Sequence, residues 1–184
     1  MRVRQVLLAG VGCAAIGVLV ATGIHAQQPA RGRAAGGAAQ AQPARVQGNL
    51  LQVMRGILYP ASNVIFAAQS DDPAAIKPAA DASTSPNPLT SAYGGWTAVE
   101  NAGIAIAEAA NLLTIPGRMC ANGKPAPIQN ADWRTWVQEL RGAGMATYKA
   151  AQSKNQDMII EAAGAVSEVC QYCHDKYREV PNRC

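Results

Sequence analysis

Residues 156–178 read QDMIIEAAGAVSEVCQYCHDKYR, and apolar side chains recur in this stretch every three or four residues. The repeating positions are Ile159, Ala162, Val166, Val169, Cys173 and Tyr177. Such spacing is typical of one buried face of an α-helix. The pair Lys154-Asn155 interrupts the pattern, so we predict a helix from about Gln156 to Arg178.

The same periodicity marks three segments upstream. Residues 45–69 carry an apolar stripe, and Pro60 predicts a kink within it. Residues 92–115 form a second helical segment that Pro116-Gly117 ends, and Asp132 is the predicted N-cap of a third that runs to about Ser153. The later two helical segments place three tryptophans on their inner faces, where we expect them to pack in the core: Trp96, Trp133 and Trp136. The apolar stripe of the first segment consists of Leu50, Met54, Ile57, Ala61 and Ile65, and it is widened by Leu51, Val53, Leu58 and Val64.

Two irregular stretches, residues 70–91 and 118–130, separate these segments, and both are rich in proline and polar residues. No segment has the pattern of a strand, and no internal repeat occurs. Four helices of about 20 residues joined by loops predict an all-α fold, an antiparallel four-helix bundle over residues 45–184. Many inner positions are Ala or Gly, which leaves space for a bulky apolar guest.

The overall composition limits the classes of protein to consider. The chain has 184 residues, of which 49% are hydrophobic and 15% charged, and this suits about one domain. Its net charge is +4, and loss of Arg2 and Arg4 with a leader would leave fourteen cations against twelve anions. That excess is too small for a nucleic-acid-binding surface.

The first 26 residues have the zones of a secretory signal peptide: a cationic start, an uncharged apolar run from Val6 to Ile24, and a possible cleavage site at Ala26. A membrane anchor is the alternative. We expect export to the periplasm with cleavage, no membrane span afterwards, and loss of Cys13 with the leader. Residues 27–44 contain no large apolar residue, so we expect a flexible tether.

Cys170-Gln171-Tyr172-Cys173-His174 has the C-x-x-C-H spacing of covalent attachment of one c-type haem. On a helix, Cys170 and Cys173 share a face, so both sulfurs can reach one porphyrin, and His174 can ligate the iron as the proximal ligand. A redox-active C-x-x-C pair and half of a zinc site are the alternatives. The first lacks a βαβ context, and the second lacks another Cys/His pair.

This motif near the end of a four-helix chain resembles the class II cytochromes c, the family of cytochrome c-prime and its low-spin relatives. The resemblance covers residues 45–178 and is strongest over Cys170 to Arg178. The proline-rich stretch 70–91, the Cys120 loop and the Cys184 tail depart from the family pattern. The resemblance implies a distal haem position that faces the first helix and is either empty or filled by a Met thioether.

Met54 is the leading candidate for that distal ligand, and a core gap-filler is the alternative reading. Met119, Met145 and Met158 are weaker candidates. Arg178 and Lys176 are expected near the haem propionates, although basic residues also suit a helix C-terminus without any cofactor.

The resemblance and the motif together predict an exported monohaem cytochrome that carries single electrons between periplasmic redox partner proteins, and we expect no enzymatic activity. The alternative is a five-coordinate haem protein that binds NO or CO, and a third reading is a helical interaction module with a structural haem. A homodimer is possible in the family.

Cys120 and Cys184 remain once Cys170 and Cys173 are assigned, and we predict a disulfide between them, with free thiols or a bridge between chains as alternatives. In an up-down-up-down bundle we expect this loop and this tail at opposite ends. Either the loop or the tail must then fold back, and the loop of residues 118–130 is long enough to reach along the bundle.

Overall fold

The computed structural model describes residues 44–178 and Cys184, so the predicted signal peptide and residues 27–43 of the tether lie outside the described residues. The regular elements are α1 (Leu50–Val53), η1 (Met54–Leu58), α2 (Tyr59–Ser70), η2 (Pro88–Thr90), α3 (Trp96–Leu112), α4 (Ala131–Ser153) and α5 (Gln156–Tyr177). The described part of the chain contains no β-strand, which confirms the all-α prediction. In that same part, no helix combines the length and apolar character needed to cross a membrane.

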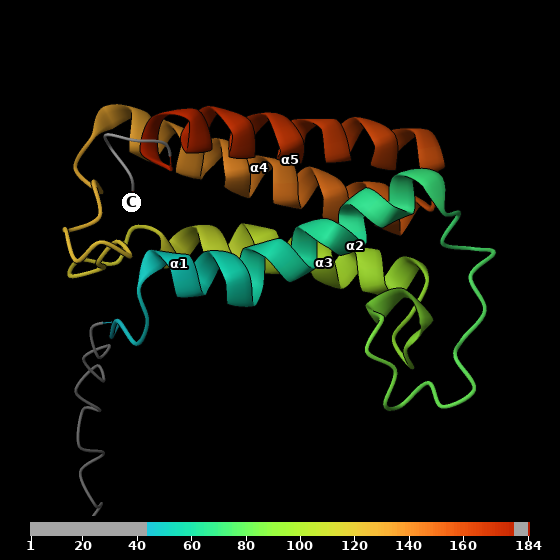
Figure 1. The fold of residues 1–184 in the computed structure, drawn as a ribbon. Helices are drawn as coiled ribbons and strands as arrows, with labels where there is room; N and C mark the ends of the chain where they lie inside the picture. Colours follow the sequence, from blue (N-terminus) through green and yellow to red (C-terminus); the bar gives the residue numbers. More distant parts are fainter. Residues whose placement is uncertain (1–43, 179–183) are drawn as a thin grey trace, which may run out of the picture. The chain divides into compact units, whose positions relative to one another are not determined.

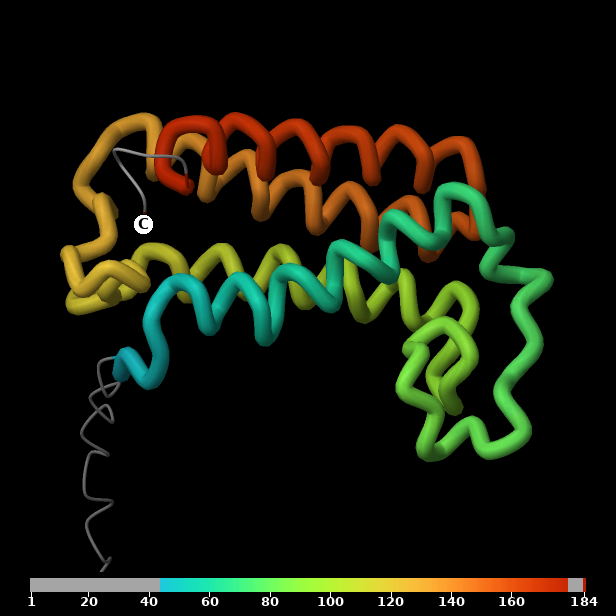
Figure 2. Tube along the Cα trace, in the orientation of Figure 1, coloured from blue at the N-terminus to red at the C-terminus, as the bar shows by residue number. Residues whose placement is uncertain are grey.

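The long helices lie side by side (Figure 1). α2 packs against α3 and α5, α3 packs against α4, and α4 packs against α5. Neighbouring helices run in opposite directions, as the tube in Figure 2 shows. α3 and α4 approach closely at two glycines: a Cβ on Gly103 would lie 2.7 Å from the Tyr148 nitrogen, and one on Gly144 would lie 2.7 Å from the Ala107 nitrogen.

The ends of the later helices follow local chemistry. α5 begins where expected, because the Asn155 side chain accepts a hydrogen bond from the Met158 N–H and Lys154 adopts a left-handed conformation with φ of 54°. The prediction that Asp132 caps α4 is wrong. Asn130 occupies the N-cap position, and Asp132 lies in the first turn, where its carboxylate accepts hydrogen bonds from Lys176 and Tyr177 instead.

The first helix differs from a regular α-helix before Pro60. Asn49 and Gln52 form a capping box that starts α1, and Met54–Leu58 is a π-helical turn in which the Tyr59 N–H donates to the Met54 carbonyl. The predicted stripe is therefore wrong at Ile57, which is 37% exposed, whereas Leu58 is buried. The irregularity lies in the turn before Pro60, close to where a kink was expected, and it shifts which side chains face inward.

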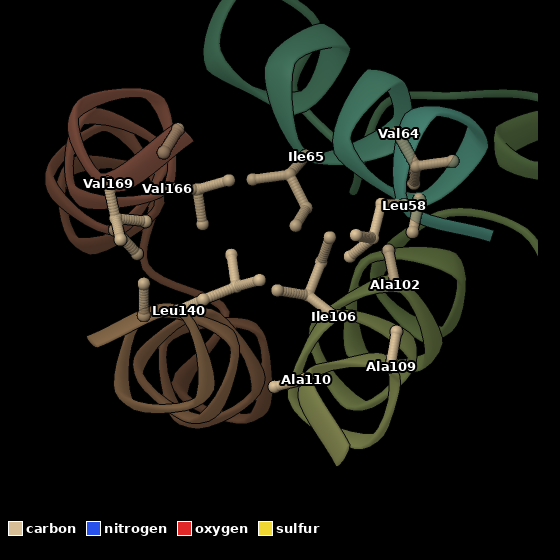
Figure 3. Packing of buried hydrophobic residues seen from close by; sticks show 14 of the residues in the cluster. Leu58, Val64, Ile65, Ala102, Ile106, Ala109, Ala110, Leu140, Val166 and Val169 are labelled. Atoms are coloured by element: carbon tan, nitrogen blue, oxygen red, sulfur yellow. The ribbon is translucent and has the colours of Figure 1, made fainter. Parts of the chain in front are cut away.

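The middle of the core draws one aliphatic side chain from each long helix. Figure 3 shows Ile65 of α2, Ile106 of α3, Leu140 of α4 and Val166 of α5 in one buried cluster. Each of the four is at most 6% exposed. Towards the start of the first helix the core gives way to a cavity, and Ile106 and Leu140 belong also to the cavity lining.

The loop of residues 118–130 lies at the same end of the helices as the last turn of α5, so the expectation that loop and tail lie at opposite ends is wrong. Alternating directions bring the end of α3, the start of α4 and the end of α5 together. The sulfurs of Cys120 and Cys184 lie at disulfide distance, with Cα atoms 4.6 Å apart. Backbone hydrogen bonds join Ala121 N–H to the Cys184 carbonyl (3.0 Å) and Cys184 N–H to the Tyr177 carbonyl (2.6 Å).

Candidate cofactor site

A cavity of about 740 Å³ lies between the first helix and the paired helices α4 and α5. Its lining is predominantly apolar and includes Leu50, Leu58, Phe66, Leu113, Val137 and Val169. A cavity of this size is large enough for a cofactor of several rings, because drug-sized ligand sites measure roughly 300–1,000 Å³. A space for an apolar guest was expected between the helices, but no Ala or Gly lines this cavity, so the small inner residues do not account for it.

One wall of the cavity carries the C-x-x-C-H motif. Cys170, Cys173, His174 and Tyr177 all lie on α5 and all border the cavity. Their spacing of three, four and seven residues puts them on one helix face, as predicted. Cys170, Cys173 and His174 are half-buried, and Tyr177 is buried.

The two thiols of this wall are not joined to each other. Burial raises the pKa of both, that of Cys173 to about 12 with a further contribution from the nearby Cys170 thiol. Both groups are consequently neutral at neutral pH. A reactive redox cysteine needs a thiolate, which forms in electropositive surroundings, so these surroundings do not suit thiol–disulfide exchange.

The opposite wall is formed by the first helix and carries Met54. This side chain is half-buried and borders the same cavity as His174. Met119, Met145 and Met158 do not border it, and Met119 and Met158 are 38% and 43% exposed. The structure thus brings together Met54 and the three motif residues, and it leaves the weaker methionine candidates elsewhere.

Two arginine side chains, those of Arg55 and Arg178, border the cavity. Arg178 borders the cavity and is exposed, as a residue facing the polar edge of a bound group would be. Lys176 does not border the cavity and instead pairs with Asp132. Arg55 also borders the cavity and was missed by the sequence analysis, although it is the only charged residue between Leu50 and Ser70.

Aromatic side chains close the end of the cavity near the disulfide. The Tyr177 ring contacts Trp133 and Trp136 edge to face, with centroids 5.1 and 5.9 Å apart. Trp133 is 2% exposed, and its Nε1–H donates to the Leu113 carbonyl at 3.1 Å. Trp96 does not border the cavity and packs against the core from a half-buried position.

A polar network fixes the Tyr177 hydroxyl behind this cluster. The hydroxyl donates to the Asp132 carboxylate at 2.8 Å and accepts a hydrogen bond from the Asn130 amide at 2.9 Å. The hydrogen bond from Lys176, with a smaller contribution from Tyr177, holds the pKa of Asp132 below its ordinary value. The last turn of α5, which follows His174, is therefore tied to the first turn of α4.

Across the described residues, no group of three or more His, Cys, Asp and Glu side chains is placed to hold a metal ion by itself. No family model, curated protein or solved structure matches this chain.

Proposed function

We propose that this chain is an exported monohaem c-type cytochrome that carries single electrons in the periplasm, built as an antiparallel four-helix bundle of the class II type. The observation that carries the proposal is that Cys170, Cys173, His174 and Met54 border one apolar cavity. A covalently held porphyrin accounts for all of them together.

The residues present fit such a group. Cys170 and Cys173 would form the two thioether bonds, and His174 would be the proximal ligand. Met54, on the facing wall, would be the distal ligand, and Arg178 at the rim would pair with a propionate. When bound, the haem supplies a one-electron iron couple whose potential depends on the axial ligands and on burial.

The chain's own residues would set the surroundings of the iron. Leu58, Phe66 and Val137 would surround the bound group with apolar side chains, and the rings of Trp133 and Tyr177 would border it at the end near the disulfide. Low solvent access and a thioether ligand both favour the reduced iron, because burial disfavours the extra positive charge of the oxidised form. Periplasmic redox proteins are the expected partners. The proposal of export rests on residues outside the described range.

A second candidate is a five-coordinate haem protein that binds NO or CO. The observation that favours it is that Leu50 and Leu58 share the first-helix wall with Met54, so this wall remains apolar if the thioether does not ligate. An open distal position behind leucines would admit a small diatomic gas.

The test is expression with the haem attachment machinery, followed by mass spectrometry and optical spectra of the purified protein. We expect the mass of one haem to be retained after acid–acetone extraction, and to be lost in the Cys170→Ser/Cys173→Ser variant. The matched control is Cys120→Ser/Cys184→Ser, which removes two other cysteines and should retain the haem. A bare chain mass in the unmodified protein would refute the proposal. Rapid binding of CO by the ferrous protein would favour the second candidate.

A further inference from the structure

Pro60 accounts for the π-helical turn that precedes it. Proline has no N–H to donate to the carbonyl four residues earlier, here that of Gly56, and in an α-helix its ring would collide with that carbonyl. The chain relieves the conflict in the turn Met54–Leu58, where the Tyr59 N–H donates to the Met54 carbonyl five residues back. We propose that Pro60, by imposing this turn, sets the direction in which Met54 enters the cavity and so acts as a positioning residue for the distal side of the site. This inference rests on the proposed function.

The first helix carries two alternative apolar stripes. A straight α-helix would bury Leu50, Met54, Ile57, Ala61 and Ile65, which recur every three or four residues. The structure instead buries Leu50, Val53, Leu58, Ala61 and Ile65. The step of five residues from Val53 to Leu58 contains one residue more than an α-helical step. The two stripes have similar apolar content, so the turn rather than hydrophobicity selects between them.

The extra residue changes the direction in which Met54 points. One residue of an α-helix spans about 100° around the axis, so an added residue rotates everything before the turn by about that angle relative to α2. Val53 takes the inward position, where it is 7% exposed. Met54 instead borders the cavity together with Ser62 and Phe66 of α2. In the straight helix Met54 would instead lie on the stripe of Leu58 and Ile65, so its side chain would enter the cavity from a direction about 100° away.

Gly56 offers a way to reverse the rotation. It lies within the turn and is exposed, and a Cβ built on it meets no atom within 4 Å. Deleting Gly56 removes the extra residue, so an α-helix can then keep Val53 and Leu58 facing inward together. A helix that is straightened by replacing Pro60 should therefore regain the original direction of Met54 when Gly56 is also deleted.

The experiment uses the haem-loaded protein with Met54→His as a reporter. A histidine at position 54 that keeps the native direction of Met54 gives a six-coordinate, low-spin spectrum whether or not Met54 itself ligates. We expect this spectrum in Met54→His, its loss when Pro60→Ala is added, and its return when Gly56 is also deleted. Gly56→Ala in the Met54→His protein is the matched control, since it keeps the chain length and Pro60, and it should leave the spectrum unchanged.

Hydrogen exchange supplies a readout that needs no haem. In Pro60→Ala the new amide at position 60 should be protected, because a straight helix lets it donate to the Gly56 carbonyl. An unprotected amide, a low-spin spectrum that survives Pro60→Ala, or a failed rescue by the Gly56 deletion would each overturn the role of Pro60. A Met54→His protein that holds haem but lacks the low-spin spectrum would also overturn the role of Pro60. A chain without covalent haem would refute the proposed function instead, and the exchange result alone would then decide on Pro60.

Discussion

The close approach of α3 and α4 at Gly144 leads to a quantitative prediction about stability. A Cβ at this position would lie 2.7 Å from the Ala107 nitrogen and 2.8 Å from the Gly103 oxygen. Both are backbone atoms, so neither can move aside without shifting α3. Overpacking of a well-packed core costs about 1–3 kcal/mol, and contacts this short with backbone belong at the upper end of that range.

Replacing glycine by alanine also has a favourable component, because alanine is the better helix former by about 1 kcal/mol. For Gly144→Ala the net loss is therefore about 2 kcal/mol in the free energy of unfolding. Gly142 lies on the same helix, but a Cβ there meets nothing within 4 Å. Gly142→Ala should accordingly stabilise the protein by about 1 kcal/mol, which puts the two variants about 3 kcal/mol apart.

Urea unfolding followed by far-UV circular dichroism measures both free energies on the purified protein. The free energy of unfolding must depend on urea concentration with the same slope in both variants. A different slope would mean that the folded or the unfolded state of one variant differs in compactness. Gly164→Ala on α5, where a Cβ also meets nothing within 4 Å, serves as a second control. If Gly144→Ala proves as stable as Gly142→Ala, the two helices do not pack as closely as described.

Three further predictions concern the site and its closed end. Met54→Ala should convert a six-coordinate spectrum into one that binds CO readily; an unchanged spectrum would leave Met54 as a packing residue. Cys120→Ala/Cys184→Ala should lower the free energy of unfolding by about 4 kcal/mol in the chain-entropy account of a 64-residue separation, and two titratable thiols per unreduced, denatured holoprotein chain would show that the bond is absent. The pKa of Asp132 is held below its ordinary 3.8, mainly by the hydrogen bond from Lys176, so its contribution to stability is complete above pH 3.8 and is lost as the pH falls through the lowered value. The stability gap between the unmodified protein and Asp132→Asn should therefore shrink on acidification, and a gap that is constant with pH in urea titrations would contradict this.

Local periodicity was enough to predict α5 and the shared face of Cys170, Cys173 and His174, because residues three and four apart on a helix are neighbours whatever the tertiary fold. It could not choose between Ile57 and Leu58 in the first helix. Both fit an apolar stripe, and the choice depends on how the backbone accommodates Pro60.

The errors at α4 and at the disulfide have a different origin, since both depend on contacts between segments far apart in the sequence. Asp132 has the chemistry of an N-cap, but Lys176 and Tyr177 compete for its carboxylate from another helix. The position of Cys120 relative to Cys184 follows from the directions of all the helices together. The error lay in tracing which helix ends these directions bring together.

The loop that holds Cys120 fastens the two cavity walls unequally. The α5 wall is followed by Cys184, whose sulfur reaches this loop. The first-helix wall is joined to the loop by noncovalent contacts, among them hydrogen bonds from the Arg118 guanidinium to the Gly48 carbonyl and from Leu50 N–H to the Met119 carbonyl at 2.9 Å. Native proteins open in local units that differ in free energy, and a segment joined by noncovalent contacts can separate while a disulfide stays closed. Transient opening of the native protein should therefore release the Met54 side first and leave the residues around His174 in place, so that the amides of residues 50–58 exchange with solvent before those of α5.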